Sequence, residues 1–292
     1  MDISGDYSKV DIHTVRMMFE NPIYDMLKEK YGPALKEFWK TASFPHWKDA
    51  SNTVLLVERR EHPNIEFVIQ NAMYYTYSKN FSLTIVCSDV SQEYVKKILG
   101  KHLETTNVIP WFSGIGTRDQ GRDEYNKTFL NKDFWKQFPA DYILSIQTDS
   151  YLRKQIPDCI WEYEYIACPW DWNLRLVGGG GLTWRKKSCV LEILKLDFPK
   201  TWGEDVFFAH GCEELDLKIP DDTIRHELLA ESHFHKLDNS LTDPFGVHQW
   251  WTYIMRTNNA KYQNDLFNLL CTCYQEFQKY PNLCEDTIET PV

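Results

Sequence analysis

Short apolar runs that alternate with segments of helical spacing constrain the fold of this chain more than any other feature. The clearest runs lie at 54–57 (VLLV), 82–88 (SLTIVCS) and 141–147 (DYILSIQ). Runs of this kind are typical of strands buried on both faces of a parallel sheet. We expect helices at 63–79, at 91–100 with Ser91 as the cap, and from 123 to 138 after a loop at 113–122. A further strand is expected at 106–110, so the order predicts an α/β protein with helices on both faces of a sheet.

The pattern after Asp149 is less regular and predicts a mixed, mostly parallel sheet. Strands are expected at 163–170, near 223–236 and in 177–184, where a glycine loop runs into a strand. Helices are expected at 188–196 and in the first half of 204–215.

Both ends of the chain are predicted to be helical extensions. Residues 1–50 show helical spacing, with Pro22 and Gly32-Pro33 as expected breaks, and another helix is expected around 262–280. We therefore predict an N-terminal extension at 1–50, a central domain at 51–256, and a C-terminal extension at 257–292 packed on that domain.

Composition narrows the possible partners and location. The net charge of −10 argues against a nucleic-acid-binding surface as the main function. No run of eighteen apolar residues occurs, and the first residues lack the basic and apolar regions of a signal peptide, so we expect no membrane span and a cytoplasmic location. The eight cysteines form no CxxC pair and are expected to be reduced thiols.

Asp149 is the first candidate for chemistry. It follows the strand at 141–147, and open parallel sheets bind ligands outside the carboxyl ends of their strands. A carboxylate in that place suits a hard divalent cation that also takes substrate phosphates. The alternative is an aspartate that caps its own turn.

Four consecutive glycines, Gly178 to Gly181, form the second candidate. Residues without a Cβ let the backbone approach a ligand and present N–H groups to it. The run lacks the Lys-Ser/Thr ending of a P-loop, so an ATPase is not predicted. A flexible loop or a bulge is the alternative.

Glu204-Asp205 and the late histidines complete the set. Either carboxylate could act as a general base on an acceptor hydroxyl, although carboxylates in a first helical turn are also explained by capping. His233, His235 and His248 could form a three-histidine zinc site, but no HExxH motif supports it, so we expect only His248 to lie in a site.

Together, these features resemble the shared motif set of GT-A-type nucleotide-sugar glycosyltransferases. That set has an Asp-x-Asp-like motif after a strand, a glycine-rich loop, an x-Glu-Asp motif and a late histidine. More narrowly, the strings SIQTDSYL, YIACPWDW, VGGGGLTWRKK, GEDVFF and PFGVHQWW resemble a little-characterised family of predicted glycosyltransferases with members in large DNA viruses. The resemblance spans about 53–251 and implies a GT-A-like, Rossmann-like sheet.

The resemblance implies a role for each matching residue. Thr148-Asp149 would belong to the donor site, where Asp149 holds a divalent ion, Mn²⁺ or Mg²⁺, with His248 as a second ligand. The ion would bridge the two phosphates of a UDP-linked donor. Gly179 and Gly180 would lie against the donor sugar and the acceptor. Asp205 would be the base in an inverting reaction, with Glu204 beside it.

The nucleotide would lie near the ends of the first two strands. By resemblance, Glu58-Arg59 and Ser88-Asp89 match the positions that hold the base and ribose, and Arg122 is a further candidate. Gln147 replaces the first Asp of the usual motif, so one carboxylate contact is missing.

The implied function is metal-dependent transfer of a sugar from a nucleotide-diphosphate donor to a hydroxyl of a glycan, a protein or a small molecule. One alternative is a sugar-phosphate nucleotidyltransferase, although VERREHPN after the first strand lacks the glycine-rich loop of that class. The other is a non-catalytic carbohydrate-binding protein, supported by Gln147 and the aromatic fraction of 15 %. Six of the 11 tryptophans lie beside the predicted site and could stack on sugar: Trp170, Trp172, Trp184, Trp202, Trp250 and Trp251.

Overall fold

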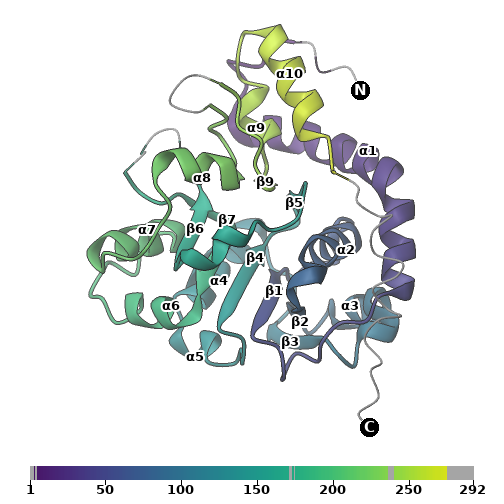
Figure 1. The fold of residues 1–292 in the computed structure, drawn as a ribbon, viewed down its shortest axis with the longest axis vertical. Helices are drawn as coiled ribbons and strands as arrows, with labels where there is room; N and C mark the ends of the chain where they lie inside the picture. The colour runs from purple at the N-terminus through teal and green to yellow at the C-terminus, as the bar shows by residue number, and fades with distance from the viewer. Residues whose placement is uncertain (1–2, 4, 171–172, 174, 236–239, 275–292) are drawn as a thin grey trace.

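The computed structural model describes residues 3, 5–170, 173, 175–235 and 240–274, and its centre is a six-stranded sheet (Figure 1). The strand order is β3-β2-β1-β4-β7-β6. The strands are β1 (Asn52–Val57), β2 (Phe81–Ser88), β3 (Asn107–Phe112), β4 (Tyr142–Ile146), β6 (Tyr165–Cys168) and β7 (Gly179–Lys186). Strands β3, β2, β1 and β4 pair in parallel, and β7 is antiparallel to both β4 and β6. The predicted α/β class, with a mixed and mostly parallel sheet, is confirmed.

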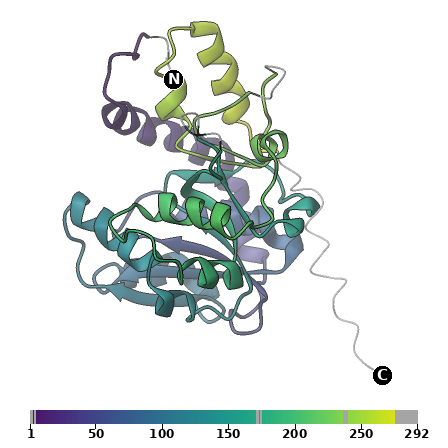
Figure 2. The same ribbon diagram turned by 90° about the vertical axis from the view of Figure 1, so that its left-hand side faces the viewer.

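Helices cover both faces of the sheet. In β1, Val54 and Leu56 face a core that includes α1 (Ile12–Thr41), α2 (Ile65–Thr76) and α3 (Gln92–Leu99). Leu55 and Val57 face a second core on the opposite side. Its helices are α4 (Arg118–Phe129), α5 (Lys132–Trp135), α6 (Lys187–Ile193) and α7 (Glu204–Glu214), some of which lie in front of the sheet in Figure 2. Burial of β1 on both faces explains its uninterrupted apolar sequence.

A small second sheet extends from the carboxyl end of β4. It has the order β5-β9-β8, formed by β5 (Ser150–Leu152), β9 (Gly246–His248) and β8 (Leu229–Ala230). Because β5 and β9 are antiparallel with Ser150 opposite His248, the turn after β4 is brought next to the late histidine.

The helix α1 is continuous, so the predicted breaks at Pro22 and Gly32-Pro33 are wrong. Both prolines lie inside the helix with exposed side chains, and Asp11 caps its start by accepting from the backbone N–H groups of His13 and Thr14. A proline costs a helix one hydrogen bond and some strain. Tertiary packing of the apolar side of α1 on α2 and on α9 (Trp251–Ile254) offsets that loss. Figure 1 shows α1, in purple, curving along the side of the molecule on which α2, α9 and α10 lie.

Several other local predictions need correction. The first part of the segment expected to form short strands near 223–236 is instead the helix α8 (Asp222–Leu228), whose start Asp221 caps by accepting from Ile224 N, and the strand β8 follows it. Ser91 does not cap α3, since its hydroxyl pairs with that of Ser88. The helix α7 extends through the whole of 204–214, and most of the glycine run belongs to β7.

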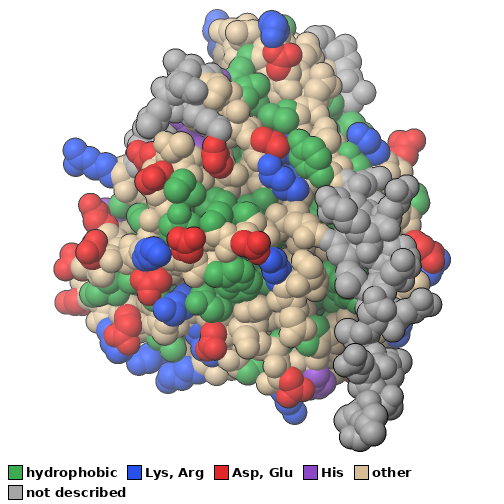
Figure 3. Space-filling view, viewed as in Figure 1, with side chains coloured by type: hydrophobic (Ala, Val, Ile, Leu, Met, Phe, Trp, Pro, Cys, Tyr) green, Lys and Arg blue, Asp and Glu red, His purple; other side chains and the backbone are tan. Residues whose placement is uncertain are grey.

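The remaining elements connect these layers. They are η1 (Tyr77–Lys79), η2 (Gly100–His102), η3 (Asp158–Glu162) and the C-terminal helix α10 (Ala260–Leu270). The predicted helix around 262–280 therefore ends earlier, and its part from 275 onward lies outside the described residues. Seven cysteines in the described part are free thiols, and no helix described there is long and apolar enough to cross a membrane. Figure 3 shows acidic and basic side chains interspersed on one face.

Candidate functional site

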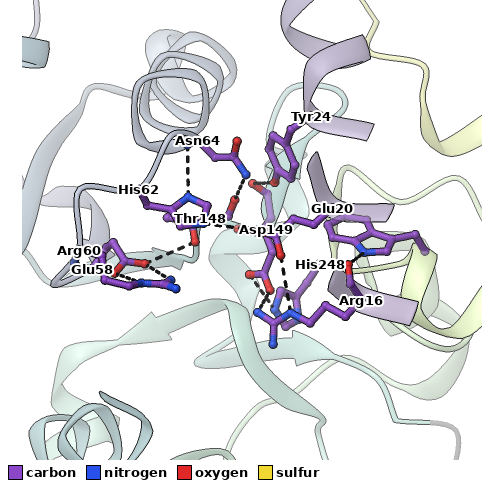
Figure 4. Close-up of polar contacts among 12 residues, drawn as sticks. Arg16, Glu20, Tyr24, Glu58, Arg60, His62, Asn64, Thr148, Asp149 and His248 are labelled. Carbon is purple, nitrogen blue, oxygen red and sulfur yellow. Dashed lines mark hydrogen bonds and ion pairs between the residues drawn. The ribbon is translucent and has the colours of Figure 1, made fainter. Parts of the chain in front are cut away.

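Asp149 lies in the turn between β4 and β5, and its side chain is 1 % exposed. The hydroxyl of Ser150 closes this turn, because it donates to Gln147 O at 2.8 Å and accepts from Gln147 N at 3.0 Å. The carboxylate of Asp149 instead faces two cationic side chains, Arg16 and His248 (Figure 4). Ser150 therefore closes the turn, and the Asp149 carboxylate is engaged in ion pairs instead.

His248 lies between two buried carboxylates. Its Nε2 is 3.3 Å from Asp149 Oδ1, and its Nδ1 is 3.4 Å from Glu231 Oε2. Gln249 Nε2 donates to the other oxygen of Glu231 at 2.7 Å, which fixes the Glu231 carboxylate. Burial alone would lower the pKa of His248, but the two carboxylates outweigh it and raise that pKa to about 10. The imidazole is therefore a cation at neutral pH in this structure.

Arg16 reaches Asp149 from α1. Its Nη2 contacts Asp149 Oδ2, and its Nε is 4.0 Å from Glu20 Oε2. Burial raises the pKa of Asp149, but the Arg16 and His248 cations outweigh this effect and hold that pKa below its ordinary value. Asp149 is thus an anion held between two cations from opposite ends of the sequence.

The glycine run gives room to the side chains of this site. A Cβ on Gly181 would lie 2.1 Å from His248 Cε1, and a Cβ on Gly180 would lie 1.8 Å from Glu204 Oε1. A Cβ on Gly179 would meet Trp170 Nε1 at 2.8 Å and Glu231 Oε2 at 2.9 Å. The glycines of β7 therefore let buried polar side chains pack directly on the strand backbone.

Glu204 and Asp205 begin α7, and their environments differ. Glu204 is buried and its Oε2 accepts from Arg185 Nη2 at 3.0 Å. Asp205 Oδ1 accepts from Val206 N at 2.8 Å. Burial first, and then the negative charge of Glu231, raise the pKa of Asp205 above its ordinary value. Burial also raises the pKa of Glu204, but among the described contacts Arg185 pairs with Glu204 and no arginine pairs with Asp205.

The four positions expected near the nucleotide lie together after β1 and β2. Ser88 Oγ donates to Arg59 O at 2.8 Å, and Asp89 Oδ1 accepts from Gly114 N at 2.7 Å. The Arg59 side chain is buried, with Nη1 2.5 Å from Glu124 Oε2 and Nη2 donating to Gly114 O at 3.1 Å. Arg59 and Asp89 thus fix the segment that follows β3.

Glu58 and Arg122 lie on different sides of this region. Glu58 accepts two side-chain hydrogen bonds from Arg60, at 2.8 and 2.7 Å, and lies 3.5 Å from the hydroxyl of Thr148. Arg122 is exposed on α4. A cavity of about 310 Å³ between β3 and α4 is lined in part by Phe112, Ser113 and Glu124, so it adjoins Arg59.

Asp149 and His248 bring together a carboxylate and an imidazole, which are two common ligands of divalent ions. Asp149 Oδ1 and both ring nitrogens of His248 are buried and make no well-aligned hydrogen bond. A carboxylate suits Mg²⁺ and Mn²⁺, and a neutral imidazole is a common metal ligand. Within the described residues no group of three or more His, Cys, Asp or Glu could hold a metal. An ion at these two residues would have to take its other ligands from phosphate and water, and His248 would have to lose its proton.

The tryptophans beside the site divide into core and partly exposed groups. Trp184, Trp250 and Trp251 are fully buried in the core and have no face for a sugar. Trp170 is also buried, and its indole nitrogen lies against Gly179. Trp202 is partly exposed and packs on Phe198 and His210, and Trp172 lies outside the described residues. The aromatic excess therefore serves mainly the core.

Two residues that contact Asp149 and His248, namely Arg16 and Glu231, were not predicted because they belong to no motif. Arg16 lies in a helix far from every motif, and Glu231 follows a two-residue strand in a segment predicted to form short strands. His233 and His235 lie nearby, where His235 stacks on Tyr262.

Comparisons with known proteins give a match of part of the chain to one family model and a set of structural neighbours. Residues 117–248 match the model of a family described as "Protein of unknown function (DUF5672)". No curated protein gives a significant match.

Among solved structures, a mannosyltransferase from Pyrobaculum calidifontis, in complex with GDP-mannose and Mn²⁺, is 15 % identical with a TM-score of 0.40. The match covers 73 % of this chain and 67 % of that one. The 4-diphosphocytidyl-2C-methyl-D-erythritol synthase from Anaerococcus prevotii is 11 % identical, with a TM-score of 0.38 over 57 % of this chain and 83 % of that one. Residues 1–349 of TarS from S. aureus are 12 % identical, with a TM-score of 0.35 over 55 % of this chain and 54 % of that one.

Proposed function

We propose that this protein is a metal-dependent glycosyltransferase of the GT-A type. It moves a sugar from a UDP-linked donor to a hydroxyl of a glycan, a protein or a small molecule. The observation that carries the proposal is the distance of 3.3 Å between Asp149 Oδ1 and His248 Nε2. Two motifs far apart in the sequence thus meet, buried, at the carboxyl end of β4, which is where open α/β sheets bind ligands.

Asp149 and His248 are the proposed metal ligands. A bound Mn²⁺ or Mg²⁺ would neutralise the charge that develops on the departing diphosphate. His248 has to lose its proton to act as a ligand, and Asp149 has to share its carboxylate between the ion and Arg16. Both requirements follow from the ion pairs that these two side chains make in the structure.

Asp205 is the proposed base. It accepts the proton of the acceptor hydroxyl while that oxygen bonds to the anomeric carbon and the bond from this carbon to the diphosphate breaks. The raised pKa of Asp205 brings it closer to neutral pH, where a general base is most effective. This role applies to an inverting reaction, and Glu204 would then hold Arg185 in place instead of taking the proton.

The base and ribose of the nucleotide are placed near Glu58, Arg59, Ser88 and Asp89. These residues lie at the carboxyl ends of β1 and β2, and Arg59 reaches the cavity through its ion pair with Glu124. Gly179 and Gly180 are placed toward the donor sugar and the acceptor, on the strand that also packs on Glu231 and Glu204.

A non-catalytic carbohydrate-binding protein is the second candidate, and one observation favours it. Arg16 already pairs with Asp149, so the carboxylate has a counter-charge without any ion. Sugar binding that is indifferent to Mn²⁺ and Mg²⁺, with no release of nucleotide, would identify this class.

The test is a panel of nucleotide sugars, including UDP- and GDP-linked donors, incubated with the full chain and either Mn²⁺, Mg²⁺ or EDTA. We expect one donor to raise the melting temperature in the presence of metal and to release its nucleoside diphosphate slowly. Asp205→Asn should retain the shift in melting temperature and lose transfer to an added acceptor, because binding is intact and the base is missing. A panel without any metal-dependent shift or release would contradict the proposal.

A further inference from the structure

The N-terminal helix carries a cation into the candidate site. Arg16 contacts Asp149, and its backbone oxygen accepts from Trp251 Nε1 at 3.2 Å. The side chain of Arg16 is 32 % exposed, whereas that of Asp149 is 1 % exposed. About a third of the Arg16 side chain therefore remains open to solvent, although its guanidinium contacts a buried carboxylate. A guanidinium has five N–H donors, so the ion pair with Asp149 does not use them all.

The position of α1 does not depend on this ion pair. Val15, Ile23, Tyr24 and Leu27 on the same helix are fully buried in the core. Tyr24 also donates from its hydroxyl to Ser150 O at 3.2 Å, directly beside Asp149. Apolar packing thus fixes the helix, and the helix holds Arg16 over the turn after β4.

A second arginine, Arg60, also pairs with a buried carboxylate, and it follows the end of β1, the strand next to β4. Arg60 is paired through Nε and Nη2 with the buried Glu58, and 55 % of its side chain is exposed. Asp149 raises the pKa of Arg16, whereas the charge of Arg60 opposes that shift, so the two guanidinium groups interact. Figure 4 shows both arginines with His62, whose Nε2 is 3.4 Å from Glu20 Oε1. Two partly exposed cations, each oriented by a buried carboxylate, thus flank the end of β4.

We propose that Arg16 and Arg60 bind the diphosphate of the donor, so that the N-terminal helix completes the donor site. This inference rests on the proposed function for the identity of the ligand. Phosphate oxygens match planar guanidinium groups, which donate two parallel hydrogen bonds. Arg16 lies outside residues 117–248, so the family match does not include it.

The test measures the binding of inorganic pyrophosphate to the full chain in EDTA by isothermal titration calorimetry. Pyrophosphate has the diphosphate group without a base or a sugar. We expect Arg16→Gln and Arg60→Gln each to weaken binding by about tenfold or more, because each removes charge-assisted hydrogen bonds. Arg16→Lys should lose less, since it keeps the charge without the planar fork. Lys36→Gln removes one positive charge from an exposed position of the same helix and should bind as the wild type does.

Thermal unfolding identifies variants that are not folded. If Arg16→Gln does not fold, Arg16→Lys and Arg60→Gln decide the result. Equal affinities in the wild type and in the folded arginine variants would overturn the proposal, and so would a wild type that does not bind pyrophosphate. Nucleotide-sugar turnover tests the proposed function separately. If nucleotide sugar is turned over and the variants bind pyrophosphate as the wild type does, the proposed function stands and the diphosphate site at Arg16 and Arg60 is rejected. If pyrophosphate affinity depends on the arginines and no nucleotide sugar is turned over, the diphosphate site stands and the proposed function is rejected.

Discussion

His248 is a buried imidazole between two carboxylates, and this environment makes the stability of the fold depend on pH. Its pKa rises to about 10 in the folded protein. A histidine with a raised folded pKa contributes its full stabilisation below its unfolded pKa of about 6.5, and loses it as the pH rises through the folded value. We therefore expect the advantage of the wild type over His248→Gln in free energy of unfolding to shrink from pH 7 to pH 9.

Urea denaturation of both proteins at several pH values measures this effect. The loss should not exceed about 1.4 kcal/mol per pH unit, the amount for one proton. An advantage that stays constant from pH 7 to pH 9 would show that Asp149 and Glu231 do not hold His248 as a cation.

Gly181 is the glycine on which the site depends most directly. A Cβ there would lie 2.1 Å from both Cε1 and Nε2 of His248, so Gly181→Ala should displace the imidazole from Asp149. We expect turnover of the nucleotide sugar to fall by about tenfold to a hundredfold, as loss of the support of a ligand does in metal sites. Steady-state kinetics measures this.

Gly121→Ala is the matched control for Gly181→Ala. The nearest atom to its added Cβ is Arg59 Cδ at 3.8 Å, an ordinary contact, and Gly121 lies inside the helix α4. Its activity should equal that of the wild type. Full activity of a folded Gly181→Ala protein would contradict the placement of His248.

The candidate site was predictable only where its residues belong to motifs. Asp149, Asp205 and His248 lie within recognisable motifs, and their residue types suit metal binding and proton transfer. Arg16 and Glu231 belong to no motif, because their roles arise from tertiary contacts that pair them with Asp149 and His248. No local pattern in the sequence records such contacts.

At the scale of elements, the predictions that held are those for strands whose side chains are buried on both faces of the sheet. The strands β1, β2 and β4 are buried on both faces, and their apolar runs make them visible in the sequence. The helix α8 was mistaken for strand because it is short and its ends depend on the cap formed by Asp221. The helix α1 was predicted as broken because local propensity counts its prolines and omits its packing on α2 and α9.

Gly32→Ala tests whether α1 is continuous through the segment predicted as a break. Apart from its chain neighbours, a Cβ at Gly32 would meet no atom within 4 Å, and the residue lies within the helix directly before Pro33, whose ring crowds a Cβ there and reduces the gain. We expect the free energy of unfolding to rise by about 0.5–1 kcal/mol, because alanine loses less backbone entropy than glycine in a helix. Urea denaturation measures the change, and a clear loss of stability would contradict a continuous helix.

At the scale of the whole molecule, the helix α1 and the last described helices, α9 and α10, pack together beside the site. The apolar side of α1 shares one core with the sheet and with α9 and α10, as the views in Figures 1 and 2 agree. The boundaries predicted at 1–50, 51–256 and 257–292 remain a prediction, and they describe segments that share this core.

Truncation to residues 51–292 tests the dependence of the fold on α1. It removes Val15, Ile23 and Leu27, which are fully buried, and uncovers the core on that face of the sheet. We expect the truncated chain to lose the cooperative thermal transition of the full chain, measured by circular dichroism, because exposing this core removes a large part of a small net stability. Cooperative unfolding with intact nucleotide binding would show instead that 51–292 folds on its own.

The central claim is that Asp149 binds the metal–diphosphate end of a nucleotide-sugar donor. The most direct measurement is metal-dependent turnover of the best donor by Asp149→Asn, compared with Asp141→Asn, an exposed aspartate before the other end of β4. Both variants lose one negative charge, and thermal unfolding verifies that both are folded. We predict that Asp149→Asn loses at least about a hundredfold in turnover with Mn²⁺ because the ion loses its carboxylate ligand, while Asp141→Asn keeps wild-type turnover. Equal turnover by the two variants would contradict the account.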